Sequence, residues 1–263
     1  MSKIKKLELK IQKEKLSKLI NTIKDLSNID DKIIFKFNND SLLLYSLVGE
    51  GQTINAFKSF TYDNNIFMND IDIDDTIIYI AKSAKLLVKN MRTLLDFDND
   101  INMILYYDTL GEKTYADRLQ LKSSNKLKLN FYGADPITSN TKITNEHIKD
   151  LSELNTVNFS FDLTEDDFNK IKKLASPDAE MEIFYMNIKE REEQFFVSLG
   201  ENNWDLELDT VDINEEKTLA FPKKYFKSVI IEKDSSCKVK VYDTFLMVST
   251  DNSDLLISME VTI

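Results

Sequence analysis

Residues that build most catalytic and cofactor sites are scarce in this chain. Its 263 residues include one cysteine, one histidine and five glycines. The lone Cys237 excludes an internal disulfide framework, and we expect it to be a buried strand residue. His147 lies in a polar stretch without a visible catalytic partner, and no glycine-rich phosphate loop or dinucleotide fingerprint is present. We therefore expect no enzyme activity, no catalytic residue, no metal and no cofactor.

Long apolar runs are also missing. No run of about 18 apolar residues occurs, so we expect no membrane span. The charged start Met1–Lys6 does not resemble a signal peptide, and we expect a cytoplasmic protein, in the host cytoplasm if it is viral. The chain is 42% hydrophobic and 30% charged, which is typical of a globular protein with one or two domains.

One pattern, a strand, a helix and three strands, recurs four times. Alternating apolar residues predict the strands, and apolar residues at i, i+3 and i+4 predict the helices. The first unit comprises 6–11, helix 12–27, 32–37, 42–48 and 53–61, and the second comprises 76–81, helix 82–95, 101–107, 115–121 and 126–132. The third comprises 157–163, helix 164–175, 181–188, 194–199 and 204–209, and the fourth comprises 217–220, helix 221–231, 237–242, 245–250 and 255–263.

The repeated pattern of elements is interrupted between residues 133 and 155, a stretch rich in polar residues. We interpret this stretch as an interdomain linker. The predicted organisation is an N-terminal domain at 1–132, a linker at 133–155 and a C-terminal domain at 156–263. Each domain would contain two βαβββ units.

Positive charge is concentrated in the predicted helices. They hold fourteen basic and five acidic residues, although the whole chain has a net charge of -11. The second helix carries its four cations on one stripe opposite its apolar face. Lysine binds phosphate as a flexible point charge without reading base sequence, so these helices predict non-specific binding of duplex DNA, whereas a single such face could equally be an ordinary solvated one. The candidate DNA-binding residues are Lys15, Lys18, Lys82, Lys85, Lys89, Arg92, Lys170, Lys173, Lys223, Lys224 and Lys227.

Order, spacing and pattern together resemble a known family, the DNA polymerase sliding clamps. The closest local likenesses are Cys237–Tyr242 through Leu255–Val261, and Leu42–Leu47. The chain is similar to proliferating cell nuclear antigen and to the clamps of T-even-type bacteriophages. The resemblance implies an α+β clamp fold with helices lining a ring and sheets outside, and a homotrimer that encircles DNA. It also implies a processivity factor that tethers the replicative polymerase and is opened by a separate clamp loader ATPase, with repair or transcription proteins as further partners.

The resemblance also implies two protein-binding regions. A peptide pocket beneath the linker would use Leu47, Ile54, Pro136, Ile137, Ile143, Asp254 and Leu255. Because the chain ends at Ile263, directly after its last predicted strand, we expect this pocket to lack a tail contact. The subunit interface would pair the basic edge of 126–132 with the acidic edge of 204–209, through Lys126, Lys128, Trp204, Asp205 and Glu207.

Other readings remain open. A non-enzymatic, β-rich assembly protein such as a viral particle component would explain the acidity and strand content, but not four basic helices. The alternating Asp70, Asp72 and Asp74 could hold a divalent cation, although a solvated acidic edge explains them better. A carboxylate-dependent hydrolase has no supporting motif.

Overall fold

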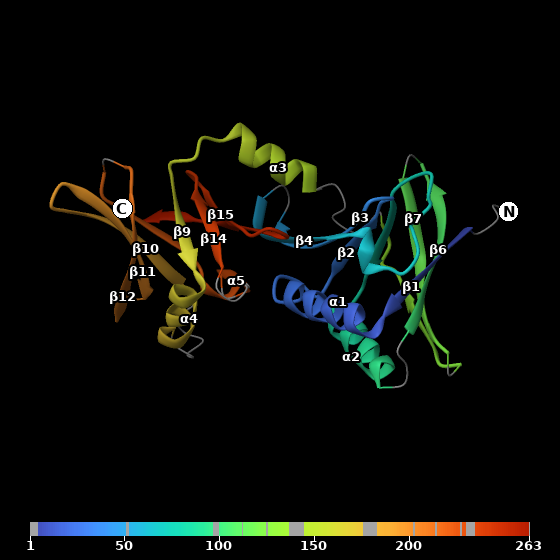
Figure 1. The fold of residues 1–263 in the computed structure, drawn as a ribbon. Coiled ribbons are helices and arrows are strands. Elements are labelled where there is room, and N and C mark those ends of the chain that lie inside the picture. The colour runs from blue at the N-terminus through green and yellow to red at the C-terminus, as the bar shows by residue number, and fades with distance from the viewer. Residues whose placement is uncertain are drawn as a thin grey trace. The chain divides into compact units, whose positions relative to one another are not determined.

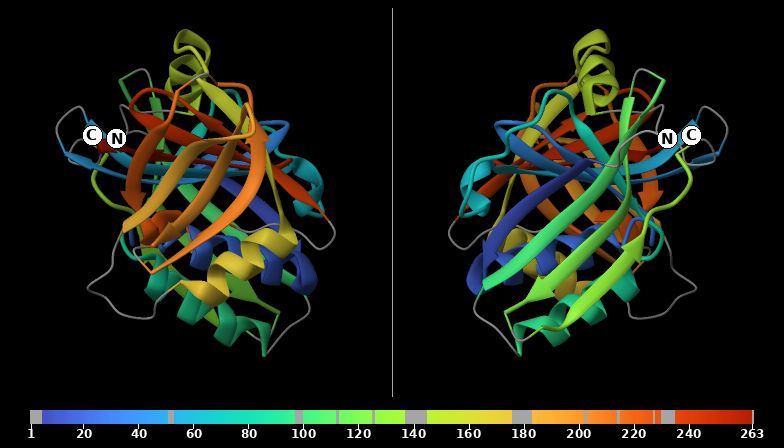
Figure 2. Two further views of the ribbon diagram at one scale, coloured as in Figure 1. Left: turned by 90° about the vertical axis from the view of Figure 1, so that its left-hand side faces the viewer. Right: turned by 90° about the vertical axis from the view of Figure 1, so that its right-hand side faces the viewer.

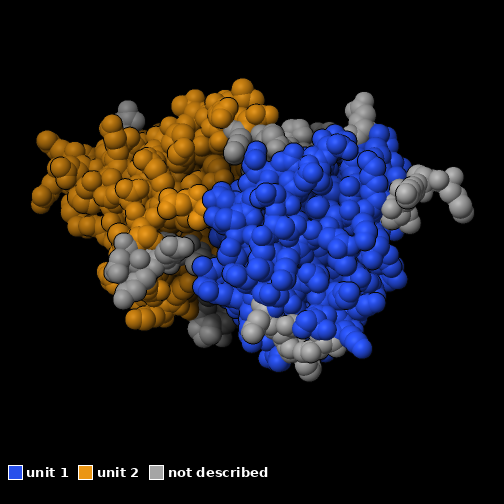
Figure 3. Space-filling model, turned by 45° about the vertical axis from the view of Figure 1, so that its right-hand side comes forward, with its two compact units in different colours: residues 1–47, 58–144 blue, residues 48–57, 145–263 orange. Residues whose placement is uncertain are grey.

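The computed structural model divides the chain into two compact units. It describes residues 5–50, 53–96, 100–111, 113–124, 126–136, 145–175, 183–201, 203–213, 215–226, 228–229 and 235–262. Unit 1 contains residues 1–47 and 58–144, and unit 2 contains residues 48–57 and 145–263 (Figure 3). None of the helices formed by these described residues is both long and apolar enough to cross a membrane.

Unit 1 is a sheet with two long helices (Figure 1). Its strands run in the order β1-β6-β7-β5-β2-β3-β4, and β8 also pairs with β7. Strand β5 pairs with β7 in parallel, whereas β1 with β6, β6 with β7, β7 with β8, and β2 with β3 and β5 pair antiparallel. The elements are β1 (Lys5–Gln12), α1 (Lys13–Leu26), β2 (Ile33–Phe37), β3 (Ser41–Glu50), β4 (Thr53–Asp63), η1 (Asn64–Ile66), β5 (Ile77–Ala81), α2 (Ala84–Leu95), β6 (Asp100–Leu110), β7 (Lys113–Ser123) and β8 (Lys128–Tyr132).

The core of unit 1 lies between its two helices and the sheet. Leu7, Leu9 and Ile11 alternate along β1 and are buried, so one face of the strand points into the core. The apolar stripes of α1 and α2 pack against this face, and the two helices contact each other. The right-hand view of Figure 2 shows β1, β6 and β7 as neighbouring strands. The predicted elements of this unit are confirmed, with ends that shift by a few residues.

Unit 2 contains two groups of strands. One is a five-stranded sheet in the order β12-β11-β10-β13-β17, and the other runs β16-β15-β14-β9. Residues 48–57, at the adjoining ends of β3 and β4, also belong to this unit. The elements are α3 (Asn145–Leu154), β9 (Phe159–Thr164), α4 (Glu165–Leu174), β10 (Ile183–Arg191), β11 (Gln194–Glu201), β12 (Trp204–Val211), β13 (Lys217–Pro222), α5 (Lys223–Phe226), β14 (Ser236–Val241), β15 (Phe245–Ser249), β16 (Ser253–Ser258) and β17 (Glu260–Thr262).

Aromatic rings fill the centre of unit 2. Phe184 meets Trp204 edge-on at a centroid distance of 6.0 Å and Phe226 at 5.9 Å. Phe168 of α4 lies 5.7 Å from Phe226, which joins the helix to this cluster. Edge-to-face packing of this kind is favoured by the charge distribution of the rings. It fixes α4, β12 and α5 around one aromatic core.

Helices α2 and α4 have side-chain caps at their first turns, whereas α1 has none. Ser83 accepts the amide of Leu86 at 3.3 Å, and Thr164 accepts the amide of Asp167 at 3.2 Å. These bonds satisfy backbone donors that a helix start leaves open. Thr164, the first residue of the third predicted helix, is the N-cap of α4, and α2 begins at Ala84, two residues later than predicted.

Three features differ from the sequence prediction. Residues 145–154 form a helix inside the expected linker, where Ile148 is buried and the Tyr242 hydroxyl donates to the Ser152 carbonyl at 3.4 Å. The last predicted strand is divided into β16 and β17, which belong to different groups of strands. Met259, the residue between them, donates its amide to the Thr244 carbonyl.

The third difference is the fourth predicted helix. Only Lys223–Phe226 is helical among its described residues, and Pro222 ends β13 instead of lying in the first helical turn. Ser228 and Val229 donate to the carbonyls three residues before them, which tightens and closes the turn. Residue 227 and residues 230–231 of the predicted helix lie outside the described residues.

Candidate nucleic-acid and protein interfaces

Helix α2 presents the clearest cationic surface. Lys85, Lys89 and Arg92 are exposed on it, and Lys82 is exposed just before it. Leu87, Val88 and Met91 are buried on the opposite side, so the cations form one stripe as predicted. None of the four cations forms an ion pair within the described part of the chain. Their charge is therefore available to an anionic ligand.

Helix α1 lies beside α2 and adds to this surface. Lys18 is exposed, whereas Lys15 is half-buried and donates to the Asn65 carbonyl. Asp25, the acid near the end of the helix, bonds the buried ammonium of Lys58 on β4. This pair removes an acidic charge from the helix surface. The α1–α2 pair is thus more cationic than its sequence composition indicates.

Helix α4 is charged differently. Lys170 and Lys173 are both exposed, but the Lys170 ammonium lies 2.7 Å from Asp166 and 3.4 Å from Asp167. The hydrogen bond to Asp166, with its charge, raises the pKa of Lys170. Exposed i, i+4 pairs of this kind compete with an external phosphate for the lysine. Of the two predicted cations, Lys173 is the one that forms no ion pair within the described residues.

Lys223 does not lie on a cationic surface, which corrects the sequence prediction. Its side chain is 7% exposed, and its ammonium lies 2.7 Å from the carboxylate of Glu201, which is 1% exposed. A buried lysine needs a counter-charge, and Glu201 on β11 supplies it. The neighbouring Lys224 is exposed and lies 4.7 Å from the centre of the Tyr225 ring, and Lys227 falls outside the described residues.

The two predicted subunit-interface strands both lie at sheet edges. Within the described residues, β8 pairs with β7 alone and β12 pairs with β11 alone. Lys128 projects from the exposed face of β8, and Lys126 precedes the strand in a turn with φ of 66° rather than within it. An uncovered edge carries backbone donors and acceptors that can pair with another strand.

The edge of β12 is acidic and partly neutralised within unit 2. Asp205 accepts the Ser198 hydroxyl at 2.9 Å, and Glu207 lies 3.4 Å from Arg191. Trp204, at the start of the strand, is half-buried against Phe184. The acids remain on the exposed face, so the edge combines an apolar anchor with negative charge.

A groove of about 310 Å³ that the sequence did not reveal lies beside β8. It is lined by Tyr79, Leu86, Phe131 and Tyr132, among others, and Leu86 and Tyr132 are 54% and 64% exposed. The signal in the sequence was weak, because Leu86 falls outside the apolar stripe of α2. Together with the open edge, this groove gives the β8 side of unit 1 an apolar and cationic surface.

The predicted peptide-pocket residues are divided between the units. Leu47 and Pro136 belong to unit 1, and Ile54, Asp254 and Leu255 belong to unit 2. Leu255 is 2% exposed within β16, so it cannot be a surface contact as predicted. Leu47, Ile54, Pro136 and Asp254 are half-buried, and Ile137 and Ile143 fall outside the described residues.

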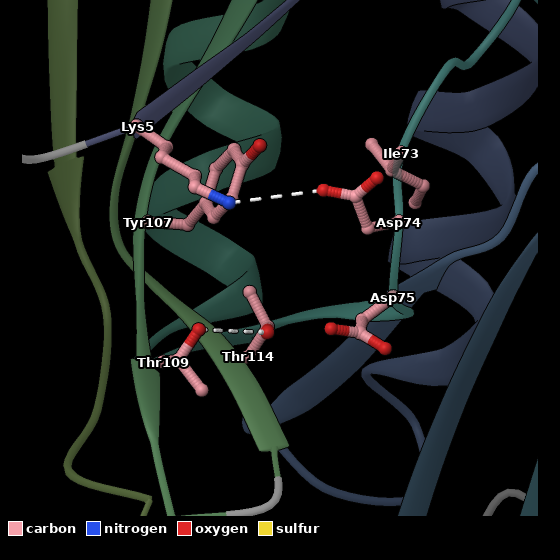
Figure 4. A pocket seen from close by; sticks show the side chains of 7 residues that line it. All are labelled: Lys5, Ile73, Asp74, Asp75, Tyr107, Thr109 and Thr114. Carbon is pink, nitrogen blue, oxygen red and sulfur yellow. Dashed lines mark hydrogen bonds and ion pairs between the residues drawn. The ribbon is translucent and has the colours of Figure 1, made fainter.

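The acidic stretch before β5, which contains Asp70, Asp72 and Asp74, does not form a cation site in the described residues. Asp74 lies 3.8 Å from the Lys5 ammonium, beside a hollow of about 20 Å³ that Asp75 and Tyr107 also line (Figure 4). No group of three or more acidic, histidine or cysteine side chains converges among the residues described. Asp70 and Asp72 are exposed and add negative charge to this side of the unit.

Comparisons with solved structures identify the architecture. The chain matches a Helicobacter pylori beta clamp bound to a DNA ligase peptide over 97% of its length and 66% of that chain, with 13% identity and a TM-score of 0.61. It matches the DNA polymerase III subunit beta of Borrelia burgdorferi over 96% and 64%, with 12% identity and a TM-score of 0.65. The chain has the fold of the DNA sliding clamps.

The clamp fold extends to an archaeal protein of similar length. A PCNA2–PCNA3 complex from Sulfolobus tokodaii matches over 97% of this chain and 99% of that chain, with 11% identity and a TM-score of 0.56. This chain spans about two thirds of the length of the bacterial clamps. No protein-family model and no curated protein sequence matches it. The clamp fold is therefore recognised from structure and from the repeated element pattern, not from residue identity.

Proposed function

We propose that this protein is a DNA polymerase processivity factor, a ring-shaped sliding clamp around duplex DNA. The observation that carries the proposal is the cationic face of α1 and α2, whose side chains form no ion pair within the described residues, in a clamp fold whose net charge is -11. Acidic surfaces elsewhere repel DNA, so this face is the favoured contact. Flexible lysines suit a ring that must slide, because they hold phosphate without fixing a register.

The proposed partners follow from this role. A closed ring needs a clamp loader ATPase to reach circular DNA, and it retains a replicative polymerase by topology. The Helicobacter clamp was crystallised with a DNA ligase peptide, which supports binding of peptides from DNA-processing proteins here as well. Leu47, Ile54, Pro136 and Asp254 remain the proposed contacts, together with Ile137 and Ile143.

The decisive experiment measures retention on DNA. After incubation with a competent loader and ATP, the protein should stay on nicked circular DNA through gel filtration and dissociate when the circle is cut. Retention that is unaffected by linearisation would instead indicate ordinary binding. No retention at all, with the loader active on its own clamp, would favour the structural assembly protein.

We further propose that three copies close the ring by pairing β8 with β12. The open edges carry opposite charges, and a contact between two different surfaces closes a ring when its rotation permits. Lys126 and Lys128 face Asp205 and Glu207 in this pairing, and Trp204 anchors its apolar side. The groove beside β8 lies on the same side of unit 1 and would be covered by the neighbour.

Charge reversal tests this pairing. Lys126→Glu with Lys128→Glu should raise the dissociation constant of the trimer by roughly a hundredfold, because juxtaposed like charges cost several kcal/mol. Sedimentation velocity at micromolar concentration measures the change. Lys238→Glu with Lys240→Glu is the matched control, since β14 is paired on both sides by β9 and β15. Equal sedimentation of wild type and the β8 variant would reject the pairing.

A further inference from the structure

The edge of β1 that does not pair with β6 is covered by a short segment of the acidic stretch that precedes β5, residues 68–75. The Lys10 amide donates to the Asn69 side-chain oxygen at 2.7 Å, and the Asn69 amide nitrogen donates to the Glu8 carbonyl at 3.0 Å. The Met68 amide donates to the Lys10 carbonyl at 2.7 Å. Three backbone groups of β1 are therefore satisfied by two consecutive residues that are not in a strand.

These three groups are the ones that another strand would use. Lys10 lies opposite Asn102 in the antiparallel ladder with β6. The backbone N–H and C=O of Lys10 bond Asn69 and Met68, so both groups point away from β6. The backbone groups of Glu8, two residues earlier, point to the same side of the strand. The Asn69 side chain uses its carbonyl oxygen as an acceptor and one N–H of its amide as a donor toward β1, so it imitates the backbone of a pairing residue.

The segment is held in place by contacts that do not involve β1. Asn39 exchanges two hydrogen bonds with the backbone of Ile73, each 3.1 Å long. Ile66, Phe67 and Ile71 are buried in the core of unit 1. Asn69 is therefore presented to β1 by an anchored loop, and its loss should uncover the edge without removing the loop.

The two edge strands of unit 1 therefore differ: β1 is covered and β8 is open. No described residue covers β8 in this way, and its lysine faces solvent. The cover on β1 also carries exposed Asp70, Asp72 and Asp74, which would repel the acidic strand β12 of another copy. Natural sheets block edges that must not pair by covering or charging them.

We propose that residues 68–75, through Asn69, block strand pairing at β1 and so direct the addition of a second copy to β8. This inference rests on the proposed ring for the identity of the correct edge. The occupant that is excluded is β12 of another copy, or β1 itself in an edge-to-edge dimer. Asn69 is then a residue that determines the specificity of assembly.

The test combines an exposing and a blocking substitution in the full chain. Asn69→Ala should increase hydrogen exchange of the Lys10 amide by about tenfold or more, since that amide loses its acceptor. The variant should also form species larger than those of wild type at equal concentration. Adding Lys10→Pro removes the exposed donor at an edge position that tolerates proline, and it should restore the wild-type mass. Asn102→Ala, on the exposed face of β6, is the matched control.

The outcomes separate this inference from the proposed ring. A wild-type monomer would reject the ring, whereas the exchange at Lys10 and the mass of Asn69→Ala would still test the cover. Unchanged exchange at Lys10 would show that Asn69 does not protect the edge. Larger species that persist in the Asn69→Ala, Lys10→Pro double variant would show that association uses another surface. Either result overturns the inference.

Discussion

Each unit contains a buried ion pair between a cationic segment and a strand, but the charges are exchanged. In unit 1 the helix supplies the acid, Asp25, and strand β4 supplies Lys58. In unit 2 the helical turn supplies the base, Lys223, and strand β11 supplies Glu201. The first arrangement hides a negative charge of α1, and the second hides a positive charge of α5. The same kind of contact therefore makes one helix surface more cationic and the other less so.

The surface lysines extend this contrast. The cationic side chains of the α2 stripe form no ion pair among the described residues, whereas Lys170 of α4 is paired with both Asp166 and Asp167. The residues in the first turn of each helix explain part of this difference in ion pairing. Acids in the first turn of α4 complement the positive end of the helix dipole, and α2 has none there. We infer that unit 1 provides most of the proposed attraction for DNA.

The largest effect should follow from breaking the buried pair of unit 2. Lys223→Ala removes the ammonium beside the buried Glu201 carboxylate, which keeps the hydrogen bond from the Trp204 indole at 3.3 Å, and the free energy of unfolding should fall by about 3–5 kcal/mol. Chemical denaturation measures this loss. DNA affinity per folded molecule should not change, because the Lys223 ammonium does not face solvent.

Two variants make this prediction specific. Lys224→Ala is the matched control, since Lys224 is the next residue, is exposed, and should affect stability by less than about 0.5 kcal/mol. Replacing both partners, as Lys223→Met with Glu201→Leu, should recover much of the stability because no unpaired charge remains. A Lys223→Ala protein as stable as wild type would mean that the pair does not hold unit 2 together.

A smaller effect is expected at the DNA surface. Replacing Lys85, Lys89 and Arg92 with Ala should lower DNA affinity and reduce the magnitude of its salt slope by about one unit per lost phosphate contact. Titration of duplex DNA at several salt concentrations measures the slope. The proposed ring should remain intact, because these side chains make no ion pair within the described residues.

The corresponding change in α4 sharpens the comparison. Replacing Lys170, Lys172 and Lys173 with Ala removes the same formal charge but should change the slope less. Asp166→Asn with Asp167→Asn should release Lys170 and strengthen binding. Equal slopes for the α2 and α4 variants would contradict the concentration of DNA contacts in unit 1.

Local sequence patterns predicted what local contacts determine. The stripe of α2 was visible because i, i+3 and i+4 spacing fixes which side chains share a helix face. Thr164 was recognisable as a cap because its acceptor bonds an amide three residues on. Strand β1 was recognisable because Leu7, Leu9 and Ile11 alternate.

Contacts between distant residues decided what the sequence could not show. Lys223 appeared to be a surface lysine, since Glu201 lies 22 residues earlier on another strand. Asn69 contacts Glu8 and Lys10 across about 60 residues, and nothing in its neighbourhood indicates an edge cover. Helix α3 was missed because polar residues surround Ile148, its buried anchor. In each case the sequence supplied the residue type, and the tertiary fold supplied its partner.

The smallest signal comes from Cys237, which can report on unit 2 alone. It is 2% exposed on β14, and burial, together with Asp162, raises the pKa of its thiol to about 12. Because the thiolate is the reactive form, its fraction at pH 8 is on the order of 10⁻⁴, and labelling of the native protein by a maleimide should be very slow. Lys223→Ala should accelerate labelling by increasing the population of opened unit 2, whereas the α2 variant should leave the rate unchanged. Mass spectrometry measures the modification at Cys237. Equal acceleration by both variants would mean that the two units open together, and the stability lost in Lys223→Ala would then be a property of the whole chain and not of unit 2 alone.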